Sequence, residues 1–177
     1  MTDSGLLHCT YCGNHLHRGG WPKQCSFCNE FNYNSPKPIA TLVLTAWDTQ
    51  RQLDGFVIIK RGIEPFKDAW AFPGGYVDHA EDWRDAAVRE AEEEIGVHLR
   101  PKGLHIIEAV STQSNFLVLF IGSDQVFYSS EWDHFDMTKG RNDKGEQEVL
   151  DILVMPCDSE LELGVPVQQR FRKRVLR

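Results

Sequence analysis

The stretch that decides how this sequence is interpreted is Gly75–Val97, GYVDHAEDWRDAAVREAEEEIGV. Its segment Glu81–Ile95 is rich in alanine and glutamate and contains no proline, a composition that favours an α-helix. Gly96 follows directly, and glycine readily takes the left-handed conformation that ends helices. Asp78 lies three residues before Glu81, which is the spacing of an N-terminal capping pair. The sequence therefore predicts one acidic helix over Glu81–Ile95.

Three of the glutamates near the end of this helix are expected on one face. At about 100° per residue, Glu90, Glu93 and Glu94 lie beside an apolar stripe, whereas Glu92 points elsewhere. The stripe consists of Ala87, Val88, Ala91 and Ile95. Like charges four residues apart destabilise a helix by roughly 0.2–0.5 kcal/mol. A solvated acidic face is one interpretation, and a bound dication with oxygen ligands, such as Mg²⁺, is the other, because it turns repulsion into attraction.

The spacing of the whole stretch favours the bound cation. It matches the pattern G-x5-E-x7-R-E-U-x-E-E-x-G-U, in which U is an apolar residue. The specified positions are Gly75, Glu81, Arg89, Glu90, Ala91, Glu93, Glu94, Gly96 and Val97. This pattern resembles the signature of the Nudix hydrolases. Because it fixes nine positions within twenty-three residues, it is far more specific than a lone glycine motif.

The resemblance implies both a fold and a reaction. It implies an α/β/α sandwich around a mixed sheet, and hydrolysis of a nucleoside diphosphate linked to another group. It also implies that Glu90, Glu93 and Glu94 hold Mg²⁺ or Mn²⁺, which neutralises phosphate oxygens and positions a water for attack. Arg89 is expected to orient these carboxylates through charge-assisted hydrogen bonds. Glu81 is expected to be a further metal ligand, through water, or a structural acceptor.

Residues on both sides of the helix complete the candidate site. The motif WAFPGG, which ends at Gly75, resembles the family's short strand and glycine turn. Gly74 leaves room for the backbone to approach a metal or a phosphate, so Gly74 and Gly75 are expected beside the bound group. The general base is either Glu93 or a carboxylate of a later loop, where Glu146 and Glu148 come just before the last strand.

Four of the five cysteines are paired by their spacing. They are Cys9 with Cys12 and Cys25 with Cys28, and twelve residues separate the two pairs. In a reducing compartment, two C-x2-C pairs predict a structural Zn²⁺ site with four thiolate ligands rather than disulfides. Gly13 and Asn29 follow the two pairs, and both residue types tolerate the positive φ of a tight metal-binding turn. Cys157 stands alone.

The cysteines divide the chain into two expected domains. Residues 1–33 are too few to fold on a hydrophobic core alone, so bound metal is expected to supply much of their stability. This segment resembles the zinc ribbon that precedes the Nudix domain in NADH pyrophosphatases and in some smaller Nudix hydrolases. Residues 34–177 form the expected Nudix domain, which begins with the stiff linker Asn34–Pro38.

Hydrophobic patterning outlines the second domain. Strands are expected at Ile39–Trp47, Phe56–Arg61, Leu104–Ser111, Phe116–Gly122 and Glu148–Met155. The segment 123–147 is a long polar insertion. Its residues Tyr128 and Trp132 either stack on a base or anchor the insertion to the body or to a second subunit. Residues 166–177 carry several cations and no acid, and are expected to form an amphipathic helix that packs over the sheet.

Composition and charge restrict the class of protein. The chain has 177 residues, of which 41% are hydrophobic and 25% charged, as in ordinary globular proteins. No apolar run is long enough to span a membrane and no signal-peptide segment is found, so we expect a cytoplasmic protein. The net charge of −7 argues against general nucleic-acid binding. RNA contact by the basic tail is therefore not favoured.

The segment after the Nudix signature bears on the substrate. NADH pyrophosphatases carry the motif S-Q-P-W-P-F-P-x-S there, but Ser111–Phe116 lacks its prolines and its tryptophan. ADP-ribose, or a flavin or nicotinamide dinucleotide, therefore fits better than NADH alone. Two alternatives stay open: hydrolysis of a cap or NAD cap at an RNA 5′ end, and ligand binding without turnover. The family resemblance also implies a homodimer.

Overall fold

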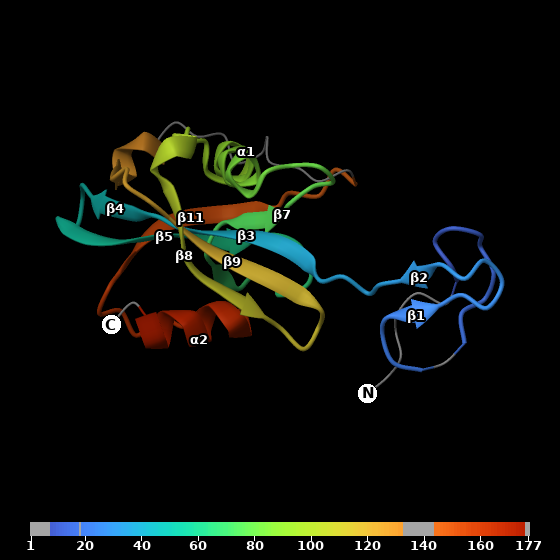
Figure 1. Cartoon of the computed structure of the whole chain (residues 1–177). Helices are drawn as coiled ribbons and strands as arrows, with labels where there is room; N and C mark the ends of the chain where they lie inside the picture. The colour runs from blue at the N-terminus through green and yellow to red at the C-terminus, as the bar shows by residue number, and fades with distance from the viewer. Residues whose placement is uncertain (1–7, 18, 133–143, 176–177) are drawn as a thin grey trace. The chain divides into compact units, whose positions relative to one another are not determined.

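The computed structural model describes residues 8–17, 19–132 and 144–175. The chain divides into two compact units, Met1–Pro36 and Lys37–Arg177 (Figure 1). Among the described helices, none is long and apolar enough to cross a membrane.

Cysteine-bearing turns form most of the N-terminal unit. Strands β1 (Lys23–Gln24) and β2 (Phe31–Asn32) pair in an antiparallel ladder. Among the described residues of this unit, Cys9, Leu16 and Cys25 are buried and apolar, and Cys28 packs against them. A core of this size is too small to stabilise a folded unit without a further contribution, such as a bound metal.

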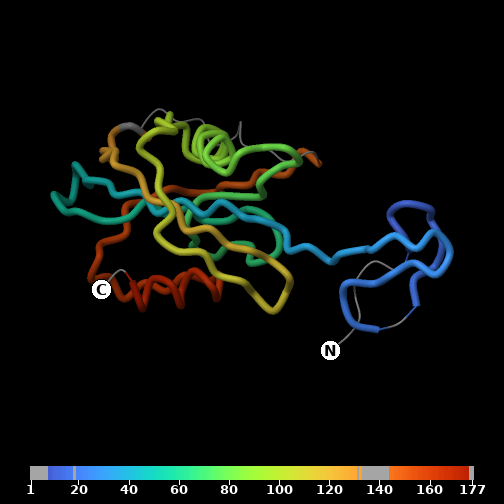
Figure 2. The backbone as a smooth tube through the Cα atoms, viewed as in Figure 1, coloured from blue at the N-terminus to red at the C-terminus, as the bar shows by residue number. Residues whose placement is uncertain are grey.

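Two sheets form the C-terminal unit. The first has the order β10 (Phe127–Tyr128), β4 (Thr45–Asp48), β5 (Leu53–Arg61), β11 (Val149–Pro156), and β6 (Trp70–Ala71) also pairs with β5. The second has the order β7 (Gly74–Tyr76), β3 (Lys37–Val43), β9 (Phe116–Ser123), β8 (Leu104–Ser111). Strand β3 is parallel to β9 and antiparallel to β7, so the second sheet is mixed. Figure 2 shows β3 and β9 lying side by side, although they are distant in the sequence.

Two helices cover the sheets from opposite sides (Figure 1). Helix α1 (Trp83–Ile95) buries alanines and Ile95 in one core, and helix α2 (Pro166–Val175) buries Phe171 in a second core. The Phe171 ring stacks on Phe120 with ring centroids 3.8 Å apart. Two short 3-10 helices, η1 (Pro101–Gly103) and η2 (Ser129–Trp132), complete the described elements. The predicted α/β/α fold class is confirmed.

The predicted strands are confirmed except for the first. The single strand expected at Ile39–Trp47 is wrong, because Leu44 separates β3 from β4 and these belong to different sheets. Leu44 is fully buried, and its carbonyl accepts the N–H of Val57 at 3.0 Å. The chain thus passes between the sheets at a buried apolar residue, so no turn-forming residue interrupts the hydrophobic run.

The predicted start of the acidic helix is also wrong. The helix begins at Trp83, two residues later than expected, and its N-cap is Asp82 rather than Asp78. The Asp82 carboxylate accepts the N–H of Arg84 at 2.9 Å. The expected pair still interacts, because Glu81 accepts the N–H of Asp78 at 2.8 Å. Glu81 therefore lies in the turn before the helix, where its carboxylate can reach back to the helix side chains.

Regular structure occupies the first part of the long insertion. β10 and η2 lie within residues 123–132, and Trp132 packs against the core under helix α1. Residues 133–143 of the insertion lie outside the described residues. The tail helix is confirmed as α2 up to Val175. Its Arg174 pairs with Glu108 of β8, so the tail packs on the second sheet as expected.

Candidate functional site

The glycine turn and helix α1 meet at two buried glutamates. Glu94 Oε2 accepts the N–H of Gly74 at 2.6 Å. A Cβ added at Gly75 would lie only 2.3 Å from Glu90 Oε1, so only glycine lets the helix approach this closely. Gly74 has φ +135, and a Cβ there would lie 2.0 Å from the carbonyl oxygen of Ala40. The contact between β7 and α1 therefore favours glycine at position 75, and the contact between β7 and β3, together with the positive φ, favours it at position 74.

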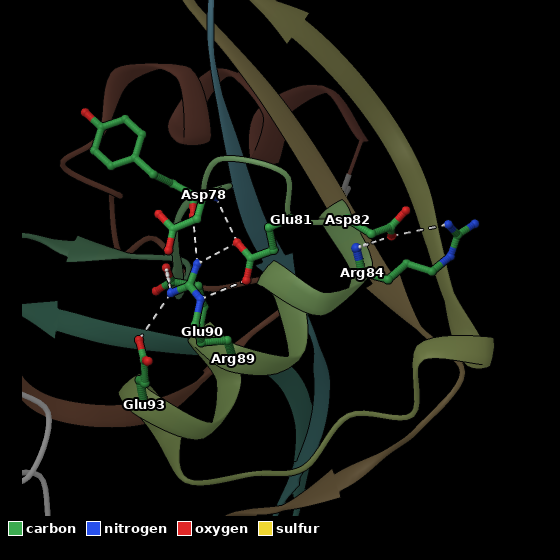
Figure 3. A network of polar contacts seen from close by, with 8 residues as sticks. Asp78, Glu81, Asp82, Arg84, Arg89, Glu90 and Glu93 are labelled. Carbon is green, nitrogen blue, oxygen red and sulfur yellow. Dashed lines mark hydrogen bonds and ion pairs between the residues drawn. The ribbon is translucent and has the colours of Figure 1, made fainter.

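Arg89 connects Glu81, Glu90 and Glu93 of the signature in one hydrogen-bond network, which Figure 3 shows from close by. Its Nε and Nη2 donate to the two oxygens of Glu81 at 3.0 and 3.1 Å. Its Nη1 donates to Glu90 Oε1 at 2.7 Å and to Glu93 Oε2 at 3.3 Å. Its Nη2 also donates to the carbonyl of Tyr76 at 2.9 Å. The hydrogen bonds from Arg89 lower the pKa of Glu81, although burial raises it.

The buried carboxyl groups hold their protons more tightly than ordinary glutamates. Burial raises the pKa of Glu90 to about 7, although the hydrogen bond and charge of Arg89 lower it. Burial also raises the pKa of Glu94 well above its usual range, and the charge of Glu90 adds to this effect. The charge of Glu148 raises both pKa values, whereas Arg61 lowers that of Glu94. Deprotonation of both groups would therefore leave an excess of buried negative charge around Glu90 and Glu94.

This excess of buried negative charge fits a divalent cation. Buried charges in proteins are normally paired or coordinate a metal. The single charge of Arg89 is shared among Glu81, Glu90 and Glu93, while Glu94 accepts a hydrogen bond from the uncharged backbone N–H of Gly74. Carboxylate oxygens are the ligands that Mg²⁺ and similar hard cations prefer. The donor set at Glu90 and Glu94 is thus suited to such an ion.

The three helix glutamates are not equivalent. Glu90 and Glu94 are 8% and 6% exposed, whereas 52% of the Glu93 side chain is accessible. Glu93 lies at the rim of the network, where it contacts Arg89. Glu92 points elsewhere, as the helical wheel predicts, and its carboxylate pairs with His98 at 2.5 Å.

The two loop candidates occupy different environments. Glu148 is half-buried, and its carbonyl accepts the N–H of Gly62 at 2.7 Å, which fixes its backbone beside the end of β5. Its charge acts on both buried glutamates. Glu146 is exposed. Arg61 was not among the predicted site residues, since only the pairing of β5 with β11 brings the ends of these strands together.

The four paired cysteines converge in the N-terminal unit. Their sulfur atoms all lie within 4.8 Å of one another, and none of them forms a disulfide. Two of the Sγ–Sγ separations, Cys9 to Cys28 and Cys12 to Cys25, are 3.6 and 3.7 Å. A tetrahedral zinc with Zn–S bonds of about 2.3 Å requires sulfurs roughly 3.8 Å apart. The cluster is therefore compatible with a tetrahedral metal site.

Backbone turns and side-chain donors support this cluster. Gly13 and Asn29 have φ of 74° and 63°, as the spacing predicts, and their N–H groups donate to the carbonyls of Cys9 and Cys25. Asn32 Nδ2 donates to Cys9 Sγ at 3.4 Å. Burial raises the pKa of Cys9, but hydrogen bonds from Asn32 and from the backbone outweigh it and lower that pKa to about 6. A thiolate, the form that binds metal, is thus favoured at Cys9.

The raised carboxyl pKa values predict a pH-dependent stability. Without added Mg²⁺ or Mn²⁺, Glu90 keeps its proton in the folded state up to about pH 7, whereas an unfolded chain releases it near roughly pH 4.3. The folded state binds more protons in this window, so the free energy of unfolding falls as pH rises through it. At about 1.4 kcal/mol per pKa unit, the loss from Glu90 is on the order of 4 kcal/mol. Urea unfolding curves across the window measure it.

Glu90→Gln is the matched control for this measurement, because glutamine has the same shape and does not titrate. Its stability should depend less on pH than that of the wild type, with the contribution of Glu94 remaining. Added Mg²⁺ should stabilise the wild type most at the upper end of the window, since the ion binds deprotonated carboxylates. A wild-type stability that is constant or that increases with pH contradicts the raised pKa values.

Solved structures with the same fold include two bacterial proteins. The NUDIX hydrolase from Nitrosomonas europaea is 18% identical with a TM-score of 0.53, and the match covers 95% of this chain and 91% of that one. The MutT NUDIX hydrolase from Burkholderia pseudomallei is 17% identical with a TM-score of 0.52, covering 80% of this chain and 98% of that one. At these identities the likeness concerns the fold alone.

Curated relatives match over shorter stretches. The chain is 28% identical over 111 residues to Nudix hydrolase 27, chloroplastic, of Arabidopsis thaliana, covering 53% of this chain. It is 44% identical over 48 residues to the ADP-ribose pyrophosphatase of Methanocaldococcus jannaschii, and 40% identical over 45 residues to the RNA pyrophosphohydrolase of Sphingopyxis alaskensis, covering 27% and 25% of this chain. The matches span 49%, 28% and 28% of the relatives' own lengths.

The family comparison covers most of the chain. The model of the NUDIX domain matches residues 36–174, a range that includes β3 to α2, the glycine turn and the whole carboxylate network. The chain therefore belongs to the Nudix hydrolase family.

Proposed function

We propose that this chain hydrolyses the diphosphate bond of a nucleoside diphosphate linked to a second group, and that ADP-ribose or a flavin or nicotinamide dinucleotide is its substrate class. The observation that carries the proposal is the pair of buried carboxylates of Glu90 and Glu94, which lie against the glycine turn. When both are deprotonated, their negative charge exceeds what Arg89 offsets. A diphosphate enzyme needs such a pair to hold a cation against phosphate oxygens.

The proposed roles follow from where each side chain lies. Glu90 and Glu94 hold Mg²⁺, or Mn²⁺ in its place, with Glu93 contributing from the rim. When bound, the ion neutralises phosphate oxygens and lowers the pKa of a bound water. Arg89 positions Glu90 and Glu93 through its hydrogen bonds. Glu81 acts as the structural acceptor that fixes Arg89, because both of its carboxylate oxygens accept from that guanidinium.

For the general base, we favour Glu148 over the other candidates. Its charge acts on both buried glutamates, so its carboxylate lies near the expected reaction centre. Glu93 is half exposed and accepts a hydrogen bond from Arg89, which makes it less available as a proton acceptor. Glu146 is exposed.

Two curated relatives indicate two substrate classes. The relative named ADP-ribose pyrophosphatase supports the small-molecule class. The relative named RNA pyrophosphohydrolase supports an RNA 5′ end as the second candidate. The net charge of −7 favours the small molecule, because proteins that bind RNA usually neutralise phosphates with lysine and arginine. We therefore place ADP-ribose and related dinucleotides first.

The cysteine cluster is proposed to hold one structural Zn²⁺. The support is the spacing of the four sulfurs and the absence of a sizeable apolar core among the described residues of that unit. Free thiols in this arrangement fit a reducing compartment, so we propose a cytoplasmic location. A homodimer is the expected assembly by family resemblance.

A panel of diphosphate compounds tests the proposed reaction. With Mg²⁺, the wild type should release a nucleoside monophosphate and a phosphorylated product, identified by mass spectrometry. Glu94→Gln and Glu90→Gln should each lower kcat by at least about 100-fold, because each removes a carboxylate from the cation site. Glu92→Gln is the control on the same helix, since Glu92 pairs with His98 instead. Its activity should match the wild type.

The same panel separates the alternatives. A capped RNA oligomer should be hydrolysed no faster than the corresponding free dinucleotide, and a strong preference for the RNA would favour the second candidate. Absence of product from every compound, with Mg²⁺ and with Mn²⁺, would favour the alternative in which the chain binds a ligand without turnover.

Single glutamine variants identify the base. Glu148→Gln should lower kcat by about 100- to 10,000-fold, the usual contribution of a positioned base, whereas Glu146→Gln should leave kcat near the wild-type value. Steady-state rates at saturating substrate measure both. If Glu93→Gln causes the large loss and Glu148→Gln does not, the base lies in the helix instead of the loop.

Metal content tests the zinc site. Purified protein should carry one equivalent of zinc by inductively coupled plasma mass spectrometry, because four thiolates complete a closed tetrahedral site. Cys9→Ser should lose most of that zinc, since the serine hydroxyl does not replace a thiolate. Cys157→Ser is the matched control: Cys157 is the fifth, exposed cysteine and lies outside the cluster. Full zinc content in Cys9→Ser, or none in the wild type, contradicts the assignment.

A further inference from the structure

One exposed aromatic side chain belongs to the carboxylate network through its backbone. Within the described part of the C-terminal unit, the aromatic residues with strongly exposed side chains are Phe66, Tyr76 and Tyr128. Tyr76 is the one whose carbonyl accepts a hydrogen bond from Arg89, at 2.9 Å. Tyr128 lies on β10, in the other sheet, and Phe66 lies in the loop between β5 and β6.

The strand geometry places the Tyr76 side chain on the opposite face of β7 from Glu90. A Cβ at Gly75 would meet the Glu90 carboxylate, so Gly75 faces helix α1. Successive residues of a strand point to opposite faces, so the side chain of Tyr76 points away from α1. Strand β7 is the edge strand of its sheet. The Tyr76 ring therefore stands at an open sheet edge, next to the backbone carbonyl that joins this residue to the carboxylate network.

The ring of Tyr76 is held in place and yet remains open to solvent. Its centroid lies 6.2 Å from that of Phe116, with an angle of 48° between the rings, which is a usual separation for an aromatic pair. Phe116 in turn packs against the core under α2, so it provides a fixed support. Tyr76 nevertheless remains 52% exposed. A partly exposed, supported ring of this kind is a platform on which a flat group can stack.

We propose that Tyr76, supported by Phe116, stacks on the nucleobase of a substrate whose diphosphate lies at Glu90 and Glu94. This subsite rests on the proposed function, because it requires a nucleoside diphosphate at the carboxylates. Every nucleobase has a π-face, and stacking on an aromatic side chain tolerates differences between bases. Stacking also contributes binding free energy without adding charge, which is an advantage in a site already rich in carboxylates. The contact thus selects for a nucleoside without fixing which base it carries.

Two probes separate the base contact from the phosphate contact. ADP carries a base and a diphosphate, whereas inorganic pyrophosphate carries the diphosphate alone. In Tyr76→Ala, binding of ADP with Mg²⁺ should weaken by about 5- to 100-fold, the range for removing one stacking aromatic. Binding of pyrophosphate should be unchanged, which also shows that the variant is folded. Tyr76→Phe keeps the ring and should bind ADP as the wild type does. Isothermal titration calorimetry measures all of these affinities.

Several results would overturn the proposal. ADP affinity that is unchanged in Tyr76→Ala, or ADP and pyrophosphate affinities that weaken equally, would show that the ring makes no base contact. A loss specific to ADP in Phe66→Ala or Tyr128→Ala, with none in Tyr76→Ala, would place the base elsewhere. Failure of the proposed function has a different signature: ADP binding would depend on Tyr76, yet no diphosphate compound would be hydrolysed. That outcome keeps the subsite and removes the hydrolase.

Discussion

The burial of the carboxylates of Glu90 and Glu94 is the constraint on which the C-terminal unit depends. A buried carboxylate without a full partner is costly, and proteins keep one where it binds something. The close packing around these two carboxylates restricts which residues can surround them. Gly75 has no side chain because a Cβ would meet Glu90, and the N–H of Gly74 points at Glu94. Small alanines on α1 let the helix pack closely on the sheet. The signature is thus a set of packing requirements around two acids.

Arg89 connects this buried pair to the surface. Its guanidinium makes five hydrogen bonds, to Glu81, Glu90, Glu93 and the carbonyl of Tyr76. Arginine has five N–H donors, so these contacts leave little capacity for substrate. We therefore propose that Arg89 positions the carboxylates. The late start of the helix is part of this arrangement, because Glu81 in the preceding turn can fold back onto the guanidinium, and its carboxylate holds Arg89 in place.

Local patterns in the sequence predict the parts of this molecule that local geometry determines. Helical periodicity places Glu92 apart from the other acids, and the residue types after the cysteine pairs predict the positive φ of Gly13 and Asn29. The pairing of strands that are distant in the sequence cannot be predicted from such local patterns. The passage between sheets at Leu44 has no turn signal, and the proximity of Glu148 to the buried glutamates depends on β11 pairing with β5. Burial of individual acids likewise depends on which strands surround the helix.

The arrangement separates the recognition of charge from the recognition of the nucleoside. All the groups proposed to hold the cation are acids, so a diphosphate and the protein repel each other unless the cation lies between them. Binding of the ion and binding of the diphosphate are then linked, and each strengthens the other by the same factor. Stacking on the Tyr76 ring does not enter this balance, because it involves no charge and lies on the other face of β7. Substitutions at that ring can change which substrates are preferred while the cation site and its chemistry stay the same.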